Sequence, residues 1–161
     1  MEQKKPRPKP NYKIYRANVA AVIMDENYPN EKNVWIGLRN DMKDVWQFPQ
    51  GGMDRNESVD EAFFRELGEE IGTSNVEIIA RHPDWIKYDF PKGLSGRYSG
   101  QKQKYLLAKL KNNKDINIHT QKPEFSDFKF IPMADLFEHI TAFKVPAYTI
   151  AINYFKENGY L

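Results

Sequence analysis

A helix predicted over residues 58–71 carries acidic side chains on its apolar face, and this conflict constrains the fold more than any other feature. At about 100° per residue, the hydrophobic side chains form one stripe, made of Val59, Ala62, Phe63, Leu67 and Ile71. Glu66 and Glu70 fall inside that stripe, and Glu69 lies at its margin. Because an unpaired carboxylate is costly to bury, the helix needs a cationic partner.

Local signals set the ends of this helix. Ser58 and Glu61 have the spacing of a capping box, which marks the first turn. Gly72 can end the helix, since glycine readily adopts the left-handed conformation of a C-cap. The two signals enclose the acidic cluster within a single helix.

Two kinds of cation could compensate these acids. Arginine is one. A divalent ion is the other, and it suits three carboxylates beside the glycine-rich turn at 51–52, since hard cations take oxygen ligands and retain places for water and phosphate oxygens. Magnesium is the first candidate and manganese the second. Spacing alone also allows a third interpretation, a solvated acidic helix face with no metal.

Composition limits the remaining possibilities. The chain has 161 residues, which is enough for one domain with a sizeable core. It contains no cysteine, which excludes disulfides, thiolate zinc sites and cysteine nucleophiles and suits the reducing cytoplasm. No stretch reaches the length needed to span a bilayer. We therefore expect a soluble, cytoplasmic protein that does not bind membranes.

The first residues are rich in lysine, arginine and proline. We expect residues 1–13 to form a flexible basic tail, followed by one domain over 14–161. Such a tail is usually solvated, and contact with nucleic acid is the alternative.

Apolar, β-branched runs predict the strands. They occupy residues 17–25, 33–40, 76–90, 103–111 and 127–133. The first two look paired, and residues 92–102 look like a glycine-containing loop. A second helix is predicted around residues 150–155, with Gly159 placed to stop it. The order of strands, helix, strands, helix predicts an α/β (α+β) fold with helices packed on a mixed sheet.

The acidic helix and the turn before it resemble the signature of the Nudix family, G-x5-E-x7-R-E-U-x-E-E-x-G-U. The matching residues are Gly51, Glu57, Arg65, Glu66, Leu67, Glu69, Glu70 and Gly72. Only the last position departs, because Thr73 replaces an aliphatic residue at a packing position. The resemblance implies an α/β/α sandwich and a hydrolase of nucleoside diphosphates linked to another group.

The resemblance also implies roles for these residues. The metal ligands for Mg²⁺ would be Glu66, Glu69 and Glu70, with the backbone carbonyl of Gln50 as a further ligand. Arg65 would pair with Glu57 and brace the loop against the helix. Bound metal would neutralise a phosphoanhydride, lower the pKa of a water and align the attacking and leaving oxygens. A carboxylate left free of direct ligation, Glu69 or Glu124, could accept the proton from that water.

Further motifs resemble the bacterial RNA 5′-pyrophosphohydrolases, which overlap with dinucleoside polyphosphate hydrolases. They are WQFPQGG at 46–52, YDFP at 88–91, GQKQKYLL at 100–107, PEF at 123–125 and FK at 143–144. The resemblance implies that Glu124 is a further metal ligand. It also implies removal of pyrophosphate from triphosphorylated RNA, with diphosphorylated RNA as a related partner. The alternatives are hydrolysis of dinucleoside polyphosphates, such as diadenosine tetra- or pentaphosphate, and a catalytically silent RNA-binding module.

An RNA end requires cations for its phosphates and aromatic faces for its unstacked bases. The candidates are Arg16 and Lys144 for the phosphates, Phe143 and Tyr88 for the bases, and Gln101 and Lys104 at the border of the cleft. Any one of these aromatic residues could instead belong to the core. Ala17, Val45 and Val145 depart from the subgroup pattern, and these departures bear on specificity more than on catalysis. No sequence feature identifies an activating protein.

Overall fold

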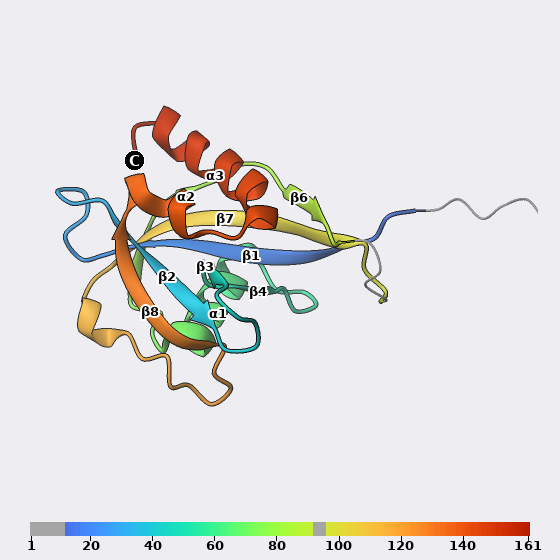
Figure 1. Cartoon of the computed structure of the whole chain (residues 1–161), viewed down its shortest axis with the longest axis horizontal. Helices are drawn as coiled ribbons and strands as arrows, with labels where there is room; N and C mark the ends of the chain where they lie inside the picture. Colours follow the sequence, from blue (N-terminus) through green and yellow to red (C-terminus); the bar gives the residue numbers. More distant parts are fainter. Residues whose placement is uncertain (1–11, 92–95) are drawn as a thin grey trace, which may run out of the picture.

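The computed structural model describes residues 12–91 and 96–161, and a mixed β-sheet forms its centre (Figure 1). Its strands are β1 (Tyr15–Met24), β2 (Asn33–Arg39), β3 (Trp46–Gln47), β4 (Gln50–Gly52), β5 (Val76–Arg81), β6 (Ile86–Asp89), β7 (Gly100–Leu110) and β8 (Phe125–Pro132). The order is β3-β2-β1-β7-β5, while β4, β6 and β8 pair with β1, β7 and β2 respectively. β1 and β7 are parallel, and the other pairs are antiparallel.

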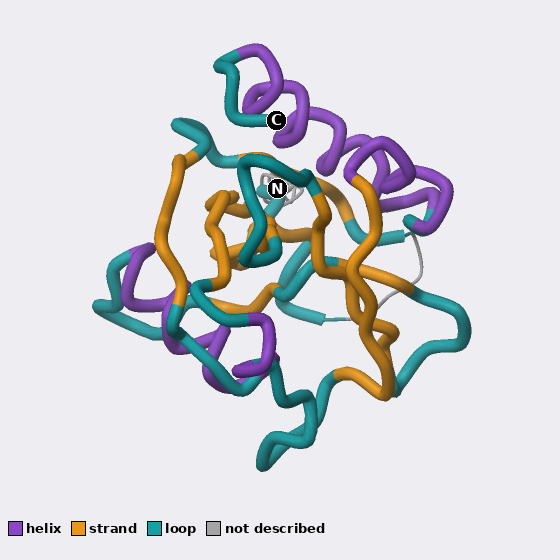
Figure 2. The backbone as a smooth tube through the Cα atoms, turned by 90° about the vertical axis from the view of Figure 1, so that its left-hand side faces the viewer, coloured by secondary structure: helices purple, strands orange, loops and turns teal. Residues whose placement is uncertain are grey.

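Helices cover both faces of this sheet. They are α1 (Val59–Ile71), α2 (Leu136–His139) and α3 (Val145–Glu157), together with short 3-10 turns at Asn113–Asp115, Met133–Asp135 and Ala142–Lys144. Figures 1 and 2 show α1 on one side of the strands and α2 and α3 on the other. The predicted α/β/α sandwich with a mixed sheet is therefore confirmed.

The two central strands bury both of their faces. In β1, Ala20, Val22 and Met24 belong to the core under α3, whereas Ala21 and Ile23 belong to the core under α1. This alternation follows from the two-residue period of a strand. With both faces covered, the strand reads as a continuous apolar run, which explains why the run over 17–25 was recognisable.

The run at 76–90 forms two strands, so the prediction of one strand is wrong. β5 reaches Arg81, which is opposite Leu106 on β7, and β6 begins at Ile86, which is opposite Gln103. The four residues 82–85 therefore lie opposite only two residues of β7, 104–105. The two extra residues form a bend that separates β5 from β6. Pro83 lies in this bend, where it has no N–H to donate to a ladder.

The predicted pairing of the first two strands is correct only beside their turn. β1 meets β2 at Met24↔Val34, whereas its long partner is β7, from Tyr15↔Gly100 to Met24↔Lys109. β4 takes the other edge of β1 farther along, at Asn18↔Gly52. Two short strands that were not predicted, β3 and β4, thus bring the glycine turn next to β1.

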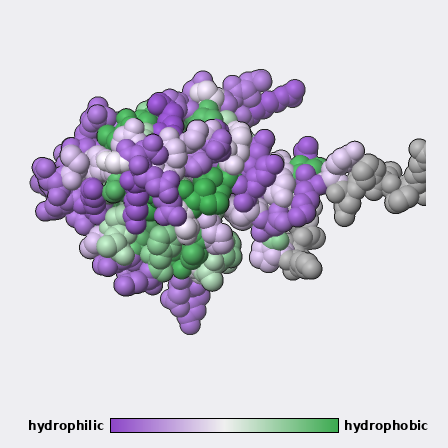
Figure 3. All heavy atoms as spheres, turned by 90° about the horizontal axis from the view of Figure 1, so that it is seen from above, coloured by the Kyte–Doolittle hydropathy of each residue, from purple (hydrophilic) through white to green (hydrophobic). Residues whose placement is uncertain are grey.

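The predicted basic tail lies outside the described residues, apart from its last two. Of these, Lys13 Nζ forms an ion pair with Asp89 Oδ2 at 2.6 Å. The loop predicted at 92–102 is also only partly described, and its end already belongs to β7. Hydrophilic residues cover most of the face seen from above, with hydrophobic residues gathered in smaller patches (Figure 3). Within the described chain, no helix has the length and apolarity to cross a membrane.

Candidate active site

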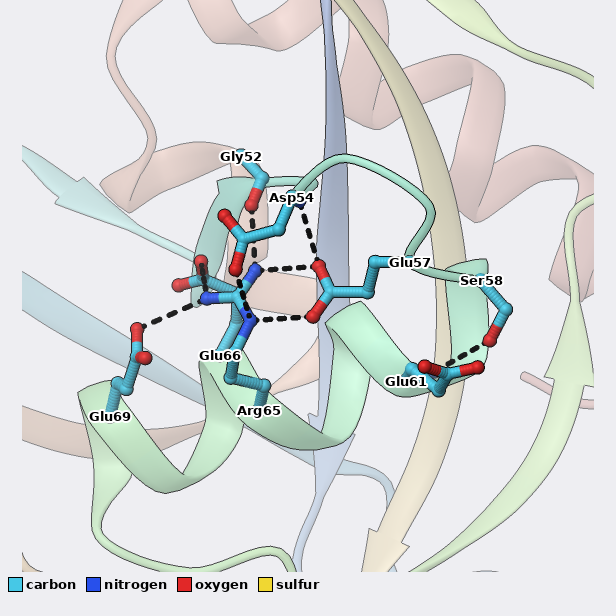
Figure 4. A network of polar contacts seen from close by, with 8 residues as sticks. All are labelled: Gly52, Asp54, Glu57, Ser58, Glu61, Arg65, Glu66 and Glu69. Atoms are coloured by element: carbon cyan, nitrogen blue, oxygen red, sulfur yellow. Dashed lines mark hydrogen bonds and ion pairs between the residues drawn. The ribbon is translucent and has the colours of Figure 1, made fainter.

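The ends of α1 are fixed as the sequence predicts. Ser58 Oγ accepts a hydrogen bond from the Glu61 backbone N–H at 3.1 Å (Figure 4). Gly72 ends the helix with φ of 76°, and a Cβ there would overlap the Asn117 carbonyl. Thr73, the departure from the Nudix signature, accepts a hydrogen bond from the Asn75 backbone N–H at 3.0 Å. The hydroxyl group therefore stabilises the turn after the helix.

Burial separates the three acids of α1. Glu70 is 6% exposed, and the side chain of Glu66 is 13% exposed. The side chain of Glu69 remains 59% exposed. A solvated acidic face therefore describes Glu69 but not Glu66 or Glu70.

Arg65 is the centre of a polar network that joins α1 to the preceding turn (Figure 4). Its Nε and Nη2 donate to the Glu57 carboxylate at 2.7 and 2.8 Å, and Nη2 also donates to the Gly52 carbonyl at 2.8 Å. These hydrogen bonds hold the pKa of Glu57 at about 2, with help from the Asp54 backbone N–H. Arg65 Nη1 donates to Glu66 at 2.8 Å. Arginine thus compensates part of the cluster.

Glu70 has much weaker compensation. Its Oε2 accepts a hydrogen bond from the Gln50 backbone N–H at 2.9 Å, and no cation among the described residues forms an ion pair with it. Burial raises the pKa of Glu70 well above its usual range, and the nearby charges of Glu66, Glu124 and Glu69 add to the effect. The carboxylates around Glu70 therefore carry more negative charge than the neighbouring cations neutralise.

Two glycines of β4 allow the side chains of Glu66 and Arg16 to lie against the backbone of this strand. A Cβ on Gly51 would overlap the Glu66 carboxylate, and a Cβ on Gly52 would overlap the Arg16 guanidinium. The sheet edge can contact both groups only because these positions have no side chain.

Four carboxylates line two adjoining cavities, of about 510 and 620 Å³; they are Glu66, Glu69, Glu70 and Glu124. We call the first cavity the cleft. Five of the six predicted substrate-binding residues also line the cleft, namely Arg16, Tyr88, Gln101, Phe143 and Lys144. Gln50 lies there as well. The fold thus brings together residues that are distant in the sequence.

Lys104 is the exception, and the prediction that it borders the cleft is wrong. Side chains alternate along β7, so Gln101 faces the cleft and Lys104 faces the opposite side. There, Lys104 Nζ donates to the Pro83 carbonyl at 2.6 Å and lies 5.4 Å from the centre of the Trp85 ring.

The cleft offers both a cation and an aromatic face next to the acids. Lys144 is 4% exposed, and its ammonium donates to Gln50 Oε1 at 3.2 Å. Burial lowers the pKa of Lys144 to about 8, with a smaller contribution from the charge of Arg39. Phe143 is 42% exposed, although it is next in sequence to the buried lysine. A phosphate and a base could be bound side by side here.

Several cleft residues were not predicted. They are Asn18, Arg39, Met42, Gln47, Phe90 and Pro91. Gln103 on β7 links two residues that line the cleft, because its Nε2 donates to Asn18 Oδ1 at 2.8 Å and to Gln50 Oε1 at 3.1 Å. Gln47, Phe90 and Pro91 lie within the WQFPQGG and YDFP motifs, which were already recognisable in the sequence. Asn18 on β1, Arg39 at the end of β2 and Met42 in the following loop belong to none of these motifs.

The donor set fits a divalent cation. No three acidic or histidine side chains, within residues 12–91 and 96–161, lie close enough together to share an ion. The hydrogen bonds explain this, because Glu66 turns to Arg65 and Glu70 to the Gln50 backbone N–H. The chemistry nevertheless suits a hard cation, since Glu70 is a buried carboxylate without an ion pair and all four acids border one space.

The fold and this site define the class of protein. Residues 14–151 match the NUDIX domain, and the chain belongs to the Nudix family of hydrolases. Nudix hydrolases generally use a divalent metal, in agreement with the acidic cluster on α1.

Within the Nudix family, the chain is similar to curated RNA pyrophosphohydrolases of several bacteria. The chain is 51% identical to the RNA pyrophosphohydrolase of a Nitratiruptor species, over 92% of this chain and 97% of that protein. It is 50% identical to the RNA pyrophosphohydrolase of Campylobacter jejuni, over 94% and 99%, and to that of Helicobacter pylori, over 93% and 99%.

Solved structures show the same fold at low sequence identity. The Ap4A hydrolase of C. elegans, in a binary complex, has a TM-score of 0.67 at 19% identity and covers 89% of this chain and 98% of that one. The dihydroneopterin triphosphate pyrophosphohydrolase of E. coli has a TM-score of 0.66 at 18% identity, over 88% and 99%. At these identities the comparison concerns the fold alone.

Proposed function

We propose that this protein removes pyrophosphate from the 5′-triphosphate end of RNA and uses Mg²⁺. One observation carries the proposal: a single cleft joins the acidic cluster to a buried cation, Lys144, an exposed cation, Arg16, and an exposed aromatic ring. Relatives about 50% identical that bear the name RNA pyrophosphohydrolase support the same substrate.

The substrate contacts follow from the chemistry of an RNA end. Arg16 and Lys144 bind phosphate oxygens, and the exposed ring of Phe143 stacks on one of the first bases. Tyr88 and Gln101 form the adjacent wall, where the Tyr88 hydroxyl donates to Gln101 Oε1 at 2.5 Å. This pair offers a second contact for a base.

The acids of α1 would hold the metal. Its ligands would be Glu66, Glu69 and Glu70, with Glu124 and the backbone carbonyl of Gln50 as further ligands. When bound, Mg²⁺ would neutralise phosphate oxygens and lower the pKa of a bound water, and Mn²⁺ could take its place. Arg65 remains on Glu57 and holds the turn against α1, which fixes the direction of the ligand-bearing face.

The reaction is a hydrolysis at the triphosphate. Water attacks phosphorus, the anhydride oxygen leaves with the two terminal phosphates, and the products are 5′-monophosphorylated RNA and pyrophosphate. Glu69 and Glu124 are the accessible carboxylates of the cluster, so whichever of the two is left free of direct ligation to the metal is the candidate for accepting the proton of the attacking water.

A direct comparison of substrates tests the proposal. Purified protein with Mg²⁺ is given a 5′-triphosphorylated oligonucleotide, its diphosphorylated form and diadenosine tetraphosphate, and kcat/KM is measured for each. We expect triphosphorylated RNA to be preferred over diadenosine tetraphosphate. The reverse order would make the protein a dinucleoside polyphosphate hydrolase. Binding of RNA without any hydrolysis would indicate a silent module.

Two cleft variants separate base recognition from phosphate recognition. Phe143→Ala should lower kcat/KM for the oligonucleotide by about 5- to 150-fold, because stacking contributes about 1 to 3 kcal/mol. Hydrolysis of inorganic tripolyphosphate, which has no base, should be affected by Lys144→Ala but not by Phe143→Ala. Phe137→Ala is the matched control, since Phe137 on α2 is 40% exposed but lies outside the cleft. Equal losses for Phe143 and Phe137 variants would exclude stacking by Phe143.

A further inference from the structure

A basic face lies behind the cleft, on the other side of the sheet where β6 pairs with β7. Tyr88 and Gln101 are opposite each other in this pair of strands, and both line the cleft. Lys87 and Lys102 form the next pair in the register. Because neighbouring residues of a strand point to opposite faces, these two lysines lie on the reverse side.

Aromatic rings hold the ammonium groups on this side. Lys102 Nζ lies 4.9 Å and Lys104 Nζ 5.4 Å from the centre of the half-buried Trp85 ring. Lys87 Nζ lies 5.3 Å from the centre of the Tyr15 ring. Cation–π contacts of this kind restrict long side chains, so the charges occupy defined positions. We call Lys87, Lys102 and Lys104, with these two rings, the lysine face.

The charge of the lysine face is not balanced locally. Across the described part of the chain, no carboxylate forms an ion pair with any of its three lysines. Asp89 lies on the same side of β6 as Lys87, pairs with Lys13 at 2.6 Å and accepts a hydrogen bond from the Tyr15 hydroxyl at 2.5 Å. Asp60 pairs with Arg81 at 2.6 Å, and Asp84, next to Trp85, is the remaining neighbouring acid in the sequence. The whole chain has a formal net charge of only +2, whereas this face carries three lysines.

We propose that the lysine face binds the phosphate backbone of RNA nucleotides downstream of the 5′ end held in the cleft. The inference rests on the proposed function. β7 is the only strand paired with β6 in the described sheet, so the outer edge of β6 is not covered by another strand. A single strand that leaves the cleft beside Tyr88 can turn round this edge and reach Lys87 and Lys102. Lysines next to aromatic rings suit such a flexible polyanion.

Substrate length provides the test. The double variant Lys87→Gln/Lys102→Gln is compared with the wild type on a triphosphorylated dinucleotide and on an unstructured triphosphorylated 12-mer. We expect kcat/KM for the 12-mer to fall at least fivefold, with the dinucleotide unchanged because it is too short to reach the lysine face. The dependence of log kcat/KM on log salt for the 12-mer should become shallower by about 1.4, or about 0.7 per lost lysine.

The matched control is Lys32→Gln/Lys156→Gln, which removes the same charge from a cavity beside β8 and the C-terminus. This variant should leave the length dependence unchanged. Equal loss in both double variants would indicate a general charge effect and overturn the proposal. So would equal loss on the dinucleotide and the 12-mer, or no loss on either.

A binding measurement keeps this inference separate from the proposed function. Fluorescence anisotropy reports the affinity for a labelled 5′-monophosphorylated 12-mer, whether or not the protein hydrolyses RNA. Weaker binding by the Lys87/Lys102 variant, but not by the Lys32/Lys156 variant, supports the lysine face even if diadenosine tetraphosphate is the better substrate. Unchanged binding overturns the lysine face even if the protein is a pyrophosphohydrolase.

Discussion

Glu70 illustrates how one side chain links stability to chemistry. It lies on the buried stripe of α1, where the surroundings disfavour its charge, and a single backbone N–H supports it. Burial and the adjacent carboxylates raise the pKa of Glu70 well above its usual range. The position is therefore unfavourable for an acid unless a cation binds, which is the property expected of a metal ligand.

Replacement of this carboxylate should separate activity from stability. With Glu70→Gln, we expect turnover of triphosphorylated RNA at saturating Mg²⁺ to fall more than tenfold, because a ligand charge is lost. The free energy of unfolding in metal-free buffer should stay level or rise, because the buried charge is removed while the amide oxygen can still accept from the Gln50 N–H. Rate assays and denaturant titrations measure both quantities.

The control for this variant is Glu61→Gln, which removes an exposed acid from the same helix. Its turnover should remain within about twofold of the wild type, as expected for a surface charge change. Retention of more than a tenth of wild-type turnover by Glu70→Gln would refute the assignment of Glu70 as a ligand.

The pair of Glu57 and Arg65 gives a prediction about acid stability. The folded-state pKa of Glu57 is lowered to about 2 from 4.5, mainly by hydrogen bonds from Arg65. Its contribution to stability is therefore fully present above pH 4.5 and is lost as the pH falls through 2. Glu57→Gln should cost about 1 to 3 kcal/mol at pH 7, and the difference from the wild type should shrink towards pH 2. Urea titrations across this range measure it.

Asp60→Asn is the matched control for the Glu57 variant. Asp60 also accepts two hydrogen bonds from an arginine, Arg81, but both side chains are about half exposed. Solvent screening should limit the cost of this change to about 1 kcal/mol or less. Equal costs for the two variants would show that burial of the Glu57–Arg65 pair does not strengthen it.

Site residues differed in how far the sequence could predict them. Glu57, Arg65 and Glu66 lie in one continuous stretch, so they could be predicted from its resemblance to the Nudix signature, whereas spacing alone left a solvated acidic face possible. Asn18 and Arg39 belong to different strands and meet the site only through the pairing of the sheet. Strand register is a property of the tertiary structure, and a single amino-acid sequence contains no direct signal for it.

At the scale of the helix, Gly68 inside α1 and Gly72 at its C-cap should respond in opposite ways to replacement by alanine. Gly68 lies inside the helix, and a Cβ there would meet no atom within 4 Å. Gly68→Ala should raise the free energy of unfolding by about 0.5 to 1 kcal/mol, since alanine has the higher helix propensity. Gly72→Ala should lower it by at least about 1 kcal/mol, because the left-handed backbone is strained and the Cβ overlaps Asn117. Denaturant titrations give both values, and the same sign for both would contradict the C-cap.

The hydrophobic pattern predicted where strands occur better than it predicted which strands pair. The apolar runs of β1 and β7 were recognisable, but their long parallel pairing was not, because sequence neighbours suggest hairpins. The start of β7 decided the outcome for Lys104. The predicted strand began at residue 103, whereas β7 begins at Gly100 and includes both Gln101 and Lys104. Residues three apart in one strand point to opposite faces, so Lys104 lies away from the cleft.

At the scale of the whole molecule, the sandwich fixes the acids before any ligand arrives. α1 is packed on the sheet through Phe63, Leu67 and Ile71, so its acidic positions cannot move apart without disturbing the core. Repulsion among the carboxylates is therefore retained in the folded state and is absent from an extended chain. A cation that binds the cluster should stabilise the entire fold.

This linkage predicts that Mg²⁺ stabilises the folded protein. At a concentration about one hundred times its dissociation constant, Mg²⁺ should add about 2.7 kcal/mol to the free energy of unfolding, and the melting temperature should keep rising with the logarithm of concentration. Glu70→Gln should lose most of this increase, whereas Glu61→Gln should retain it. Calorimetry of metal-free protein titrated with MgCl₂, against NaCl of equal ionic strength, measures the effect. An equal rise in the Glu70 variant, or with NaCl alone, would show that the stabilisation is general screening of charge and not a metal bound by α1.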